Sequence, residues 1–138
     1  MVTLKAYPDI GKKYGEAVCV AGIDRDTNDW IRLYPVAFRD LPQDRKFAKY
    51  ATILVEARKS KSDPRPESYT PAIDSLQVIQ GPLPSGVAQK RRDFILPLIQ
   101  EGTCSIYAQQ KVEGVSLGLF EPTELLEFKW ERTDEECS

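Results

Sequence analysis

Residues 17–36 predict an antiparallel β-hairpin, and this pattern constrains the fold more than any other in the chain. The apolar run AVCVAGID at 17–24 is typical of a buried strand. The segment RDTND at 25–29 is rich in Asp and Asn, whose side chains favour tight turns. WIRLYPV at 30–36 alternates aromatic and charged residues with aliphatic ones, which is the period of a strand with two different faces. A sheet of antiparallel neighbours is therefore expected.

Further strands are expected in four segments that alternate apolar and polar residues: 51–61, 75–81, 112–122 and 124–132. The main helical pattern spans 84–102, and Pro97 within it predicts a kink or two short helices. No alternation of strand and helix indicates a parallel sheet. The expected fold class is mainly β, a β-rich α+β chain with one main helix. The architecture would be a small antiparallel OB-like or SH3-like barrel, or two packed small barrels.

The length of 138 residues suits one domain. Residues 1–132 are expected to form a single compact unit, with a division into two small β subdomains, 1–80 and 81–132, as the alternative. The acidic tail at 133–138 is expected to be disordered, because it has no apolar residues to bury. The sequence contains no run of about 20 apolar residues and no signal-peptide pattern at its start, so a cytoplasmic location is expected.

The chain has no histidine, which excludes Ser-His-Asp and Cys-His nucleophile pairs within it. Its three cysteines, Cys19, Cys104 and Cys137, match no zinc-binding spacing. Turn formation accounts for the acidic residues of the hairpin turn, so a metal-dependent nuclease using Asp24 and Asp26 is the least favoured function. No catalytic residue, metal site or cofactor is predicted, and a non-enzymatic role is favoured.

Charge is distributed unevenly along the chain. Residues 1–100 hold 16 Lys and Arg against 12 Asp and Glu, a balance of +4, whereas residues 101–138 hold 3 against 9, a balance of −6. The first part therefore suits a polyanionic partner and the last part does not. The alternative is that two solvated surfaces simply differ in charge.

Trp30, Arg32 and Tyr34 would share one face of their strand, because successive side chains of a strand point to opposite sides. If Ile31 and Leu33 pack inward, two aromatic rings flanking a guanidinium face outward. Aromatic rings stack on nucleic acid bases and Arg adds phosphate or cation–π contacts. The alternative is structural: the rings are buried against a second layer with Arg32 clamped between them, and Trp30 has little access to solvent.

Basic residues recur from 39 to 65, interleaved with aromatic residues: Arg39, Arg45, Lys46, Lys49, Arg58, Lys59, Lys61 and Arg65, with Phe47, Tyr50 and Tyr69 among or near them. This composition is typical of a groove for single-stranded nucleic acid. A solvated strand edge protected by lysines is an equally good explanation. The predicted nucleic-acid-binding residues are Trp30, Arg32, Tyr34, Arg39, Lys46, Lys49, Arg58, Lys59 and Lys61.

The segments YGEAVCVAGIDRDTNDWIRLYPV, RPESYTP and SLGLFEPTELLEFKW resemble the dual OB-containing domain family of small prokaryotic proteins from mobile-element and biological-conflict gene neighbourhoods. The matching pieces cover roughly residues 14–80 and 114–130. The resemblance implies two consecutive small barrels and a nucleic acid or nucleotide ligand. It supplies no catalytic residues. The chain departs from the pattern at RLYP, where the family would have RPV.

These observations favour a non-enzymatic OB-like module that binds single-stranded DNA or RNA, in a mobile-element or defence context. An adaptor that recognises a protein partner is the alternative, since Trp, Tyr and Arg are also favoured anchors of protein interfaces. The expected partners are therefore single-stranded nucleic acid or a nucleotide, or a protein, and not a membrane. The oligomeric state is not predicted.

Overall fold

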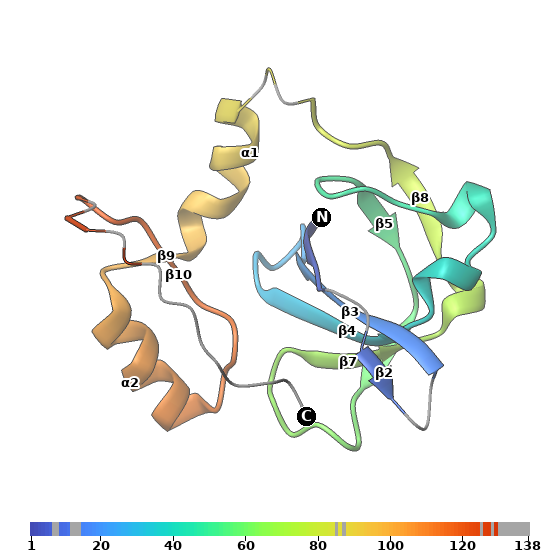
Figure 1. The fold of residues 1–138 in the computed structure, drawn as a ribbon, viewed down its shortest axis with the longest axis horizontal. Helices are drawn as coiled ribbons and strands as arrows, with labels where there is room; N and C mark the ends of the chain where they lie inside the picture. The colour runs from blue at the N-terminus through green and yellow to red at the C-terminus, as the bar shows by residue number, and fades with distance from the viewer. Residues whose placement is uncertain are drawn as a thin grey trace.

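The computed structural model describes residues 1–6, 9–11, 15–84, 86, 88–124, 126–127 and 129, and it is mainly β, as predicted (Figure 1). Its strands are β1 (Val2–Lys5), β2 (Asp9–Gly11), β3 (Gly15–Ile23), β4 (Trp30–Val36), β5 (Thr52–Leu54), β6 (Ala57–Lys59), β7 (Ser68–Pro71), β8 (Gln77–Gln80), β9 (Ile99–Gln100) and β10 (Leu119–Phe120). The α-helices are α1 (Ala88–Ile95) and α2 (Thr103–Glu113). Short 3-10 helices are η1 (Phe38–Asp40), η2 (Gln43–Arg45), η3 (Ile73–Ser75) and η5 (Leu96–Leu98).

The largest sheet has the strand order β1-β3-β4-β7-β6, with β2 also pairing with β3. β3 and β4 form the predicted hairpin, with Val20 opposite Leu33 and Ile23 opposite Trp30. β4 and β7 are parallel, which corrects the expectation of a wholly antiparallel sheet. After β4 the chain first forms β6 at the edge of the sheet. It then turns back into β7, which lies between β4 and β6, antiparallel to β6 and parallel to β4.

The strand expected over 51–61 is divided into β5 and β6 by a break at Glu56, whose N–H donates to Ser75 Oγ at 2.8 Å. β5 pairs with β8, whereas β6 pairs with β7. Just before β5, Val2 N–H donates to the carbonyl of Ala51 at 2.9 Å and Tyr50 N–H donates to the carbonyl of Val2 at 2.7 Å. The segment 50–59 therefore contacts β1 at its start and pairs with β7 at its end. Among the described strands, the pairing does not amount to a closed barrel.

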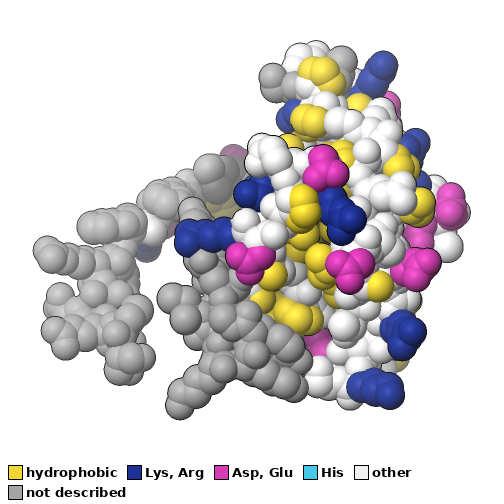
Figure 2. Space-filling model, turned by 90° about the vertical axis from the view of Figure 1, so that its right-hand side faces the viewer, with side chains coloured by type: hydrophobic (Ala, Val, Ile, Leu, Met, Phe, Trp, Pro, Cys, Tyr) yellow, Lys and Arg dark blue, Asp and Glu magenta, His cyan; other side chains and the backbone are white. Residues whose placement is uncertain are grey.

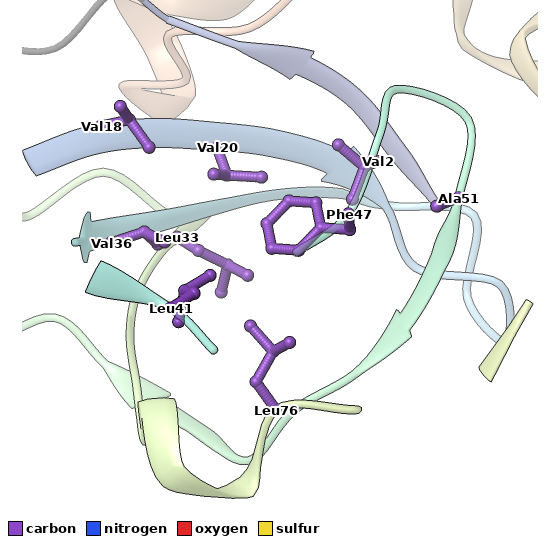
Figure 3. Packing of buried hydrophobic residues seen from close by; sticks show 9 residues of the cluster. All are labelled: Val2, Val18, Val20, Leu33, Val36, Leu41, Phe47, Ala51 and Leu76. Atoms are coloured by element: carbon purple, nitrogen blue, oxygen red, sulfur yellow. The ribbon is translucent and has the colours of Figure 1, made fainter. Parts of the chain in front are cut away.

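The hydrophobic core lies between β1, β3, β4 and the segments that follow β4 and η3. Its buried side chains point toward one another around Phe47 (Figure 3): Val2, Val18, Val20, Leu33, Val36, Leu41, Phe47, Ala51 and Leu76. Phe38 packs edge-to-face on Phe47, with the ring centroids 5.1 Å apart. Leu33 is buried and Ile31 packs against this cluster, so the predicted inward side of β4 is confirmed.

The C-terminal part, α1 to β10, lies beside the β-rich part (Figure 1). Arg25 of the hairpin turn lies over the ring of Phe94 in α1, 5.4 Å from its centroid, and Arg91 lies 4.2 Å from the centroid of Tyr50. β9 and β10 are a parallel pair, and α2 lies between them in the chain. Cation–π contacts thus join α1 both to the hairpin turn and to the segment before β5.

The prediction of one main helix is wrong, because the described part of the chain contains two α-helices. The helical segment expected over 84–102 contains α1 and then η5, so the break predicted at Pro97 is confirmed. Gly102 does not end that helix but precedes α2, where the hydroxyl of Ser105 donates to the carbonyl of Gly102 at 2.8 Å. α2 ends at Gly114, whose positive φ of 72° suits glycine.

The strand expected over 112–122 is wrong except at Leu119–Phe120, because its first residues close α2. Of the strand expected over 124–132, the described residues Glu124, Leu126, Glu127 and Lys129 belong to no helix or strand. The others, Trp130 among them, lie outside the described residues, as does the tail at 133–138.

Candidate binding cleft and basic surfaces

Trp30, Arg32 and Tyr34 lie on the side of β4 opposite the core, as their alternation with the buried Leu33 predicts. The three side chains differ in exposure. Trp30 and Arg32 are half-buried, and Tyr34 is 37% exposed and has an interaction partner of its own. The predicted aromatic face is therefore neither fully open nor fully enclosed.

Arg32 is covered by the C-terminal part of the chain. Its backbone N–H donates to the carbonyl of Glu67 at 2.8 Å, and its guanidinium Nη1 donates to Ser116 Oγ at 3.4 Å. The Nε atom is buried and has no acceptor among the described residues. Arg32 is thus held between β7 and the segment after α2, with its Nε buried and its Nη1 contact with Ser116 at the surface.

Glu67 is the most buried carboxylate of this region, with 5% of its surface exposed. Its Oε1 accepts hydrogen bonds from the backbone N–H of Ser116, at 2.8 Å, and from the Ser116 hydroxyl. Its Oε2 is buried without a donor in the part of the chain that the structure describes. A buried polar atom left in this state costs about 1–3 kcal/mol, so a partner for it would be stabilising.

A cleft of about 530 Å³ opens beside Trp30, between the β-rich part and the C-terminal part. On the β-rich side it is lined by Trp30, Tyr69, Glu67, Asp24 and Asp29. The opposite side comes from η5, β9, α2 and the segment after α2. Trp30 therefore borders an open space rather than being sealed by neighbouring protein.

The edge strand β6 and the residues after it present basic side chains. Arg58 lies opposite Thr70 of β7 and is exposed, and Lys61 is exposed beyond the end of the strand. Lys59 differs, because its ammonium lies 4.3 Å from the centroid of Tyr69 and donates to the carbonyl of Pro66. Lys59 is engaged within the protein, whereas Arg58 and Lys61 extend outward.

The loop after β6 contains a tight ion pair. Arg65 donates to both oxygens of Asp63, at 2.7 and 2.6 Å, and the Ser68 hydroxyl donates to Asp63 Oδ2 at 2.7 Å. The hydrogen bond from Arg65 holds the pKa of Asp63 well below its usual range. Arg65 is therefore committed to shaping the loop and is not available to a ligand.

A second group of cations lies around η1 and η2, where Arg39, Lys46 and Lys49 are all exposed. Lys5 of β1 lies nearby, with its ammonium 4.0 Å from the ring centroid of Phe38 and donating to the carbonyl of Phe47 at 2.9 Å. Burial, and then repulsion by Lys49, lowers the pKa of Lys5. An anion would relieve this repulsion.

Basic side chains do not form one continuous ladder on the face drawn in Figure 2. There, Lys and Arg side chains alternate with Asp and Glu around a band of hydrophobic residues.

On α1, Arg92 forms an ion pair with Glu121 at 2.7 Å and Arg91 donates to the carbonyl of Leu83. This agrees with a structural role for two cations of that helix.

The acidic hairpin turn is stabilised by its own backbone contacts, as predicted. Asp26 N–H donates to Asp24 Oδ1 at 2.9 Å, and Asp24 N–H donates to the carbonyl of Asp29 at 2.9 Å.

Within the described ranges, no three Cys, Asp or Glu side chains are grouped so that they could hold a metal ion. No described helix is long and apolar enough to cross a membrane.

Residues 1–97 match the family model described as "Domain of unknown function (DUF8758)". The chain belongs to the DUF8758 family. No curated protein and no solved structure matches it. The DUF8758 match covers every strand from β1 to β8 together with α1, and it includes all nine predicted binding residues. It ends at Pro97, before β9 and α2, so only one side of the cleft lies within the family match.

Sequence reasoning missed three residues of this DUF8758 chain that the structure makes prominent: Glu67, Gln100 and Ser116. Glu67 lies in a Pro-rich loop that indicates only extended structure. Its burial depends on a partner 49 residues away, and no local pattern shows that contact. Glu67 is one of five carboxylates between residues 39 and 69, so the sequence offers no signal that singles it out.

Proposed function

We propose that this chain is an OB-like module that binds single-stranded nucleic acid without enzymatic activity. The observation that carries the proposal is the connectivity of the sheet. β3 is antiparallel to β1 and β4, β4 is parallel to β7, and β7 is antiparallel to β6. The segment 50–59 reaches from β7 back to β1, where it makes the backbone hydrogen bonds of Val2. A five-stranded, partly open Greek-key barrel has these neighbours, with its fourth strand placed between its first and its fifth.

The proposed ligand surface is the outer side of β4, β7 and β6. Leu33 lies opposite Tyr69 in the parallel pair, so Tyr34 lies beside Thr70 on the outer side. Arg58 is directly opposite Thr70 and continues the row. Tyr34 offers a ring for base stacking, while Arg58 and the nearby Lys61 offer charges for phosphates. The cations Arg39, Lys46 and Lys49 around η1 and η2 form a second basic surface that extends the positive charge.

The proposal is tested by fluorescence anisotropy of labelled DNA and RNA single strands of about 15 nucleotides, a length that spans the usual site of an OB-like fold. We expect binding that weakens steeply between about 50 and 200 mM salt, because each neutralised phosphate releases counterions. The double variant Arg58→Ala/Lys61→Ala is expected to bind several-fold more weakly. Its slope of log affinity against log salt should be smaller by about 1.4, or ~0.7 for each lost contact.

Lys90→Ala is the matched control, because Lys90 is an exposed cation of α1 on neither surface. A parallel variant, Lys46→Ala/Lys49→Ala, measures whether the second basic surface takes part. The proposal fails if single strands do not bind at low salt. It also fails if both double variants bind with the affinity and salt slope of the unmodified protein.

A further inference from the structure

We propose that the cleft beside Trp30 binds a guanidinium group, presented by an arginine side chain of a peptide or by a small free molecule. This site adjoins the surface proposed for nucleic acid, because Trp30 lies on the same outer side of β4, and it would take a ligand of opposite charge. Four features of the cleft support the inference: the charge of its walls, a buried carboxylate oxygen without a donor, a second acceptor without a donor, and two aromatic rings.

The charged residues that line the cleft are all acidic. Asp24, Asp29, Glu67 and Glu113 contribute carboxylates, and among the described lining residues there is no Lys or Arg. A concave surface of one sign attracts ligands of the opposite sign and disfavours a phosphate. Arg32 beside Ser116 and Lys59 over Tyr69 lie near this lining, but they carry two charges against four carboxylates, so the cleft disfavours a nucleic acid backbone and favours a cation.

Glu67 is the second and independent observation, because its carboxylate is buried and only half satisfied. Ser116 occupies Oε1 through two donors, whereas Oε2 has none within the described part of the chain. Glu67 also lines the cleft. A carboxylate in this state favours a charged N–H donor, since such hydrogen bonds are shorter and stronger than neutral ones.

Gln100 places another acceptor on the opposite wall. Its Nε2 donates to Oε1 of Gln109 in α2, but its own Oε1 is buried without a donor from the described residues. A guanidinium is planar and carries five N–H donors in a fixed fork, so it can donate to acceptors on both sides at once. An ammonium has its three donors on one atom and satisfies separated acceptors less well.

Trp30 and Tyr69 supply the aromatic part of the lining. The Lys59 ammonium already lies 4.3 Å from the centroid of the Tyr69 ring, so Trp30 is the ring on which a guanidinium would stack. Cation–π attraction is strongest with Trp. The volume of about 530 Å³ is within the usual range of small-ligand sites, roughly 300–1,000 Å³. The cleft thus has the size, the charge and the stacking surface for an arginine side chain with part of its backbone.

The test is isothermal titration calorimetry of the full chain with N-acetyl-arginine methylamide. The corresponding citrulline compound is the control ligand, because it keeps the shape of arginine and lacks the positive charge. We expect the arginine compound to bind at least tenfold more tightly than the citrulline and lysine compounds. Agmatine and an arginine-containing peptide are titrated in parallel, and the tighter of the two identifies the source of the guanidinium.

Two variants test the assignment to this cleft. Glu67→Gln keeps an acceptor for Ser116 and removes the charge. Asp29→Asn removes a charge from an exposed side chain and keeps the backbone carbonyl that accepts from Asp24. Each is expected to weaken binding of the arginine compound, Glu67→Gln by at least tenfold. Asp44→Asn is the matched control, because Asp44 is exposed in η2 outside the cleft. Circular dichroism establishes that each variant is folded.

The inference is overturned if the arginine compound does not bind, or if citrulline binds equally well. It is also overturned if Asp29→Asn and a folded Glu67→Gln both bind as the unmodified protein does. Binding of a neutral nucleoside in place of the arginine compound would assign the cleft to bases and would refute the cation site. None of these outcomes depends on whether Arg58 and Lys61 bind single strands, so the two proposals fail separately.

Discussion

Ser116 donates two hydrogen bonds to the same carboxylate oxygen of Glu67, one from its backbone N–H at 2.8 Å and one from its hydroxyl. The two residues are 49 positions apart, and Ser116 also accepts a hydrogen bond from Arg32. One serine therefore joins β4, the loop before β7 and the segment after α2. This contact is the polar anchor of the C-terminal part on the β-rich part.

Ser116→Ala removes the hydroxyl and keeps the backbone donor to Glu67. We expect the free energy of unfolding to fall by about 1–2 kcal/mol, because a hydrogen bond to a charged group is lost at a partly buried site. Urea denaturation measures the change. Ser62→Ala is the control, because Ser62 is exposed and its hydroxyl lies 3.5 Å from that of Ser60, so a change below about 0.5 kcal/mol is expected there. Equal effects of the two variants would contradict the anchoring role.

Leu76→Ala tests the core around Phe47. Leu76 is 1% exposed and belongs to the buried cluster, so its truncation leaves a cavity and should lower the free energy of unfolding by about 2–5 kcal/mol. Leu54→Ala makes the same chemical change at a side chain that is 58% exposed, and a loss below about 1 kcal/mol is expected. Chemical denaturation of both variants should separate them clearly. If Leu54→Ala cost as much as Leu76→Ala, the assigned core would be wrong.

Gly22→Ala tests the close approach of β1 to β3. A Cβ atom at Gly22 would lie 2.5 Å from the carbonyl oxygen of Met1, which belongs to the backbone and cannot turn away. We expect a loss of about 1–3 kcal/mol, as for other overpacked sites. Gly81→Ala is the matched control, since a Cβ there meets nothing within 4 Å, and no loss is expected. Thermal unfolding of the two variants measures the difference, and a stable Gly22→Ala would show that β1 is placed differently.

Asp63→Asn should change how stability depends on pH. The hydrogen bond from Arg65 holds the pKa of Asp63 below its unfolded value of about 3.9. The ionised carboxylate therefore stabilises the folded state above about pH 4, and this stabilisation is lost as the pH falls toward the lower folded pKa. The difference in unfolding free energy between the unmodified protein and Asp63→Asn should be largest near neutral pH and should shrink below about pH 4.

Urea denaturation at a series of pH values from about 7 to 2.5 provides this measurement. Asp74→Asn is the control, because Asp74 is exposed in η3 and forms none of the ion pairs described above. A difference for Asp63→Asn that stays constant over the whole range would show that the ion pair with Arg65 does not form in solution.

The hairpin of β3 and β4 could be predicted because its signals are local. Alternation places Ile31 and Leu33 on one side, and the acidic turn supplies its own hydrogen bonds through Asp24. The break at Pro97 was predictable for the same reason, since proline lacks the N–H that a helix interior needs. Predictions that depended on one residue and its near neighbours were the ones confirmed.

The parts that escaped prediction depend on distant contacts. α2 has no fully buried residue among its eleven, so its sequence carries little amphipathic signal, and its ends are marked only by Ser105 and Gly114. The parallel pairing of β4 with β7 depends on the position of residues 37–67 between them, which place β6 at the edge of the sheet before the chain returns to β4. Alternation correctly placed Trp30 on the outer side of β4, but it could not reveal that an acidic cleft borders it, because half of that cleft comes from residues after Pro97.

That two-sided construction has a thermodynamic consequence. A molecule bound in the cleft would contact both the portion matched by the DUF8758 family and the described segment from β9 to the residues after α2, so binding would stabilise the packing of that segment on the β-rich part. By the same linkage, a substitution that weakens this packing would lower the affinity for the bound molecule, even if no residue on the β-rich side of the cleft were changed.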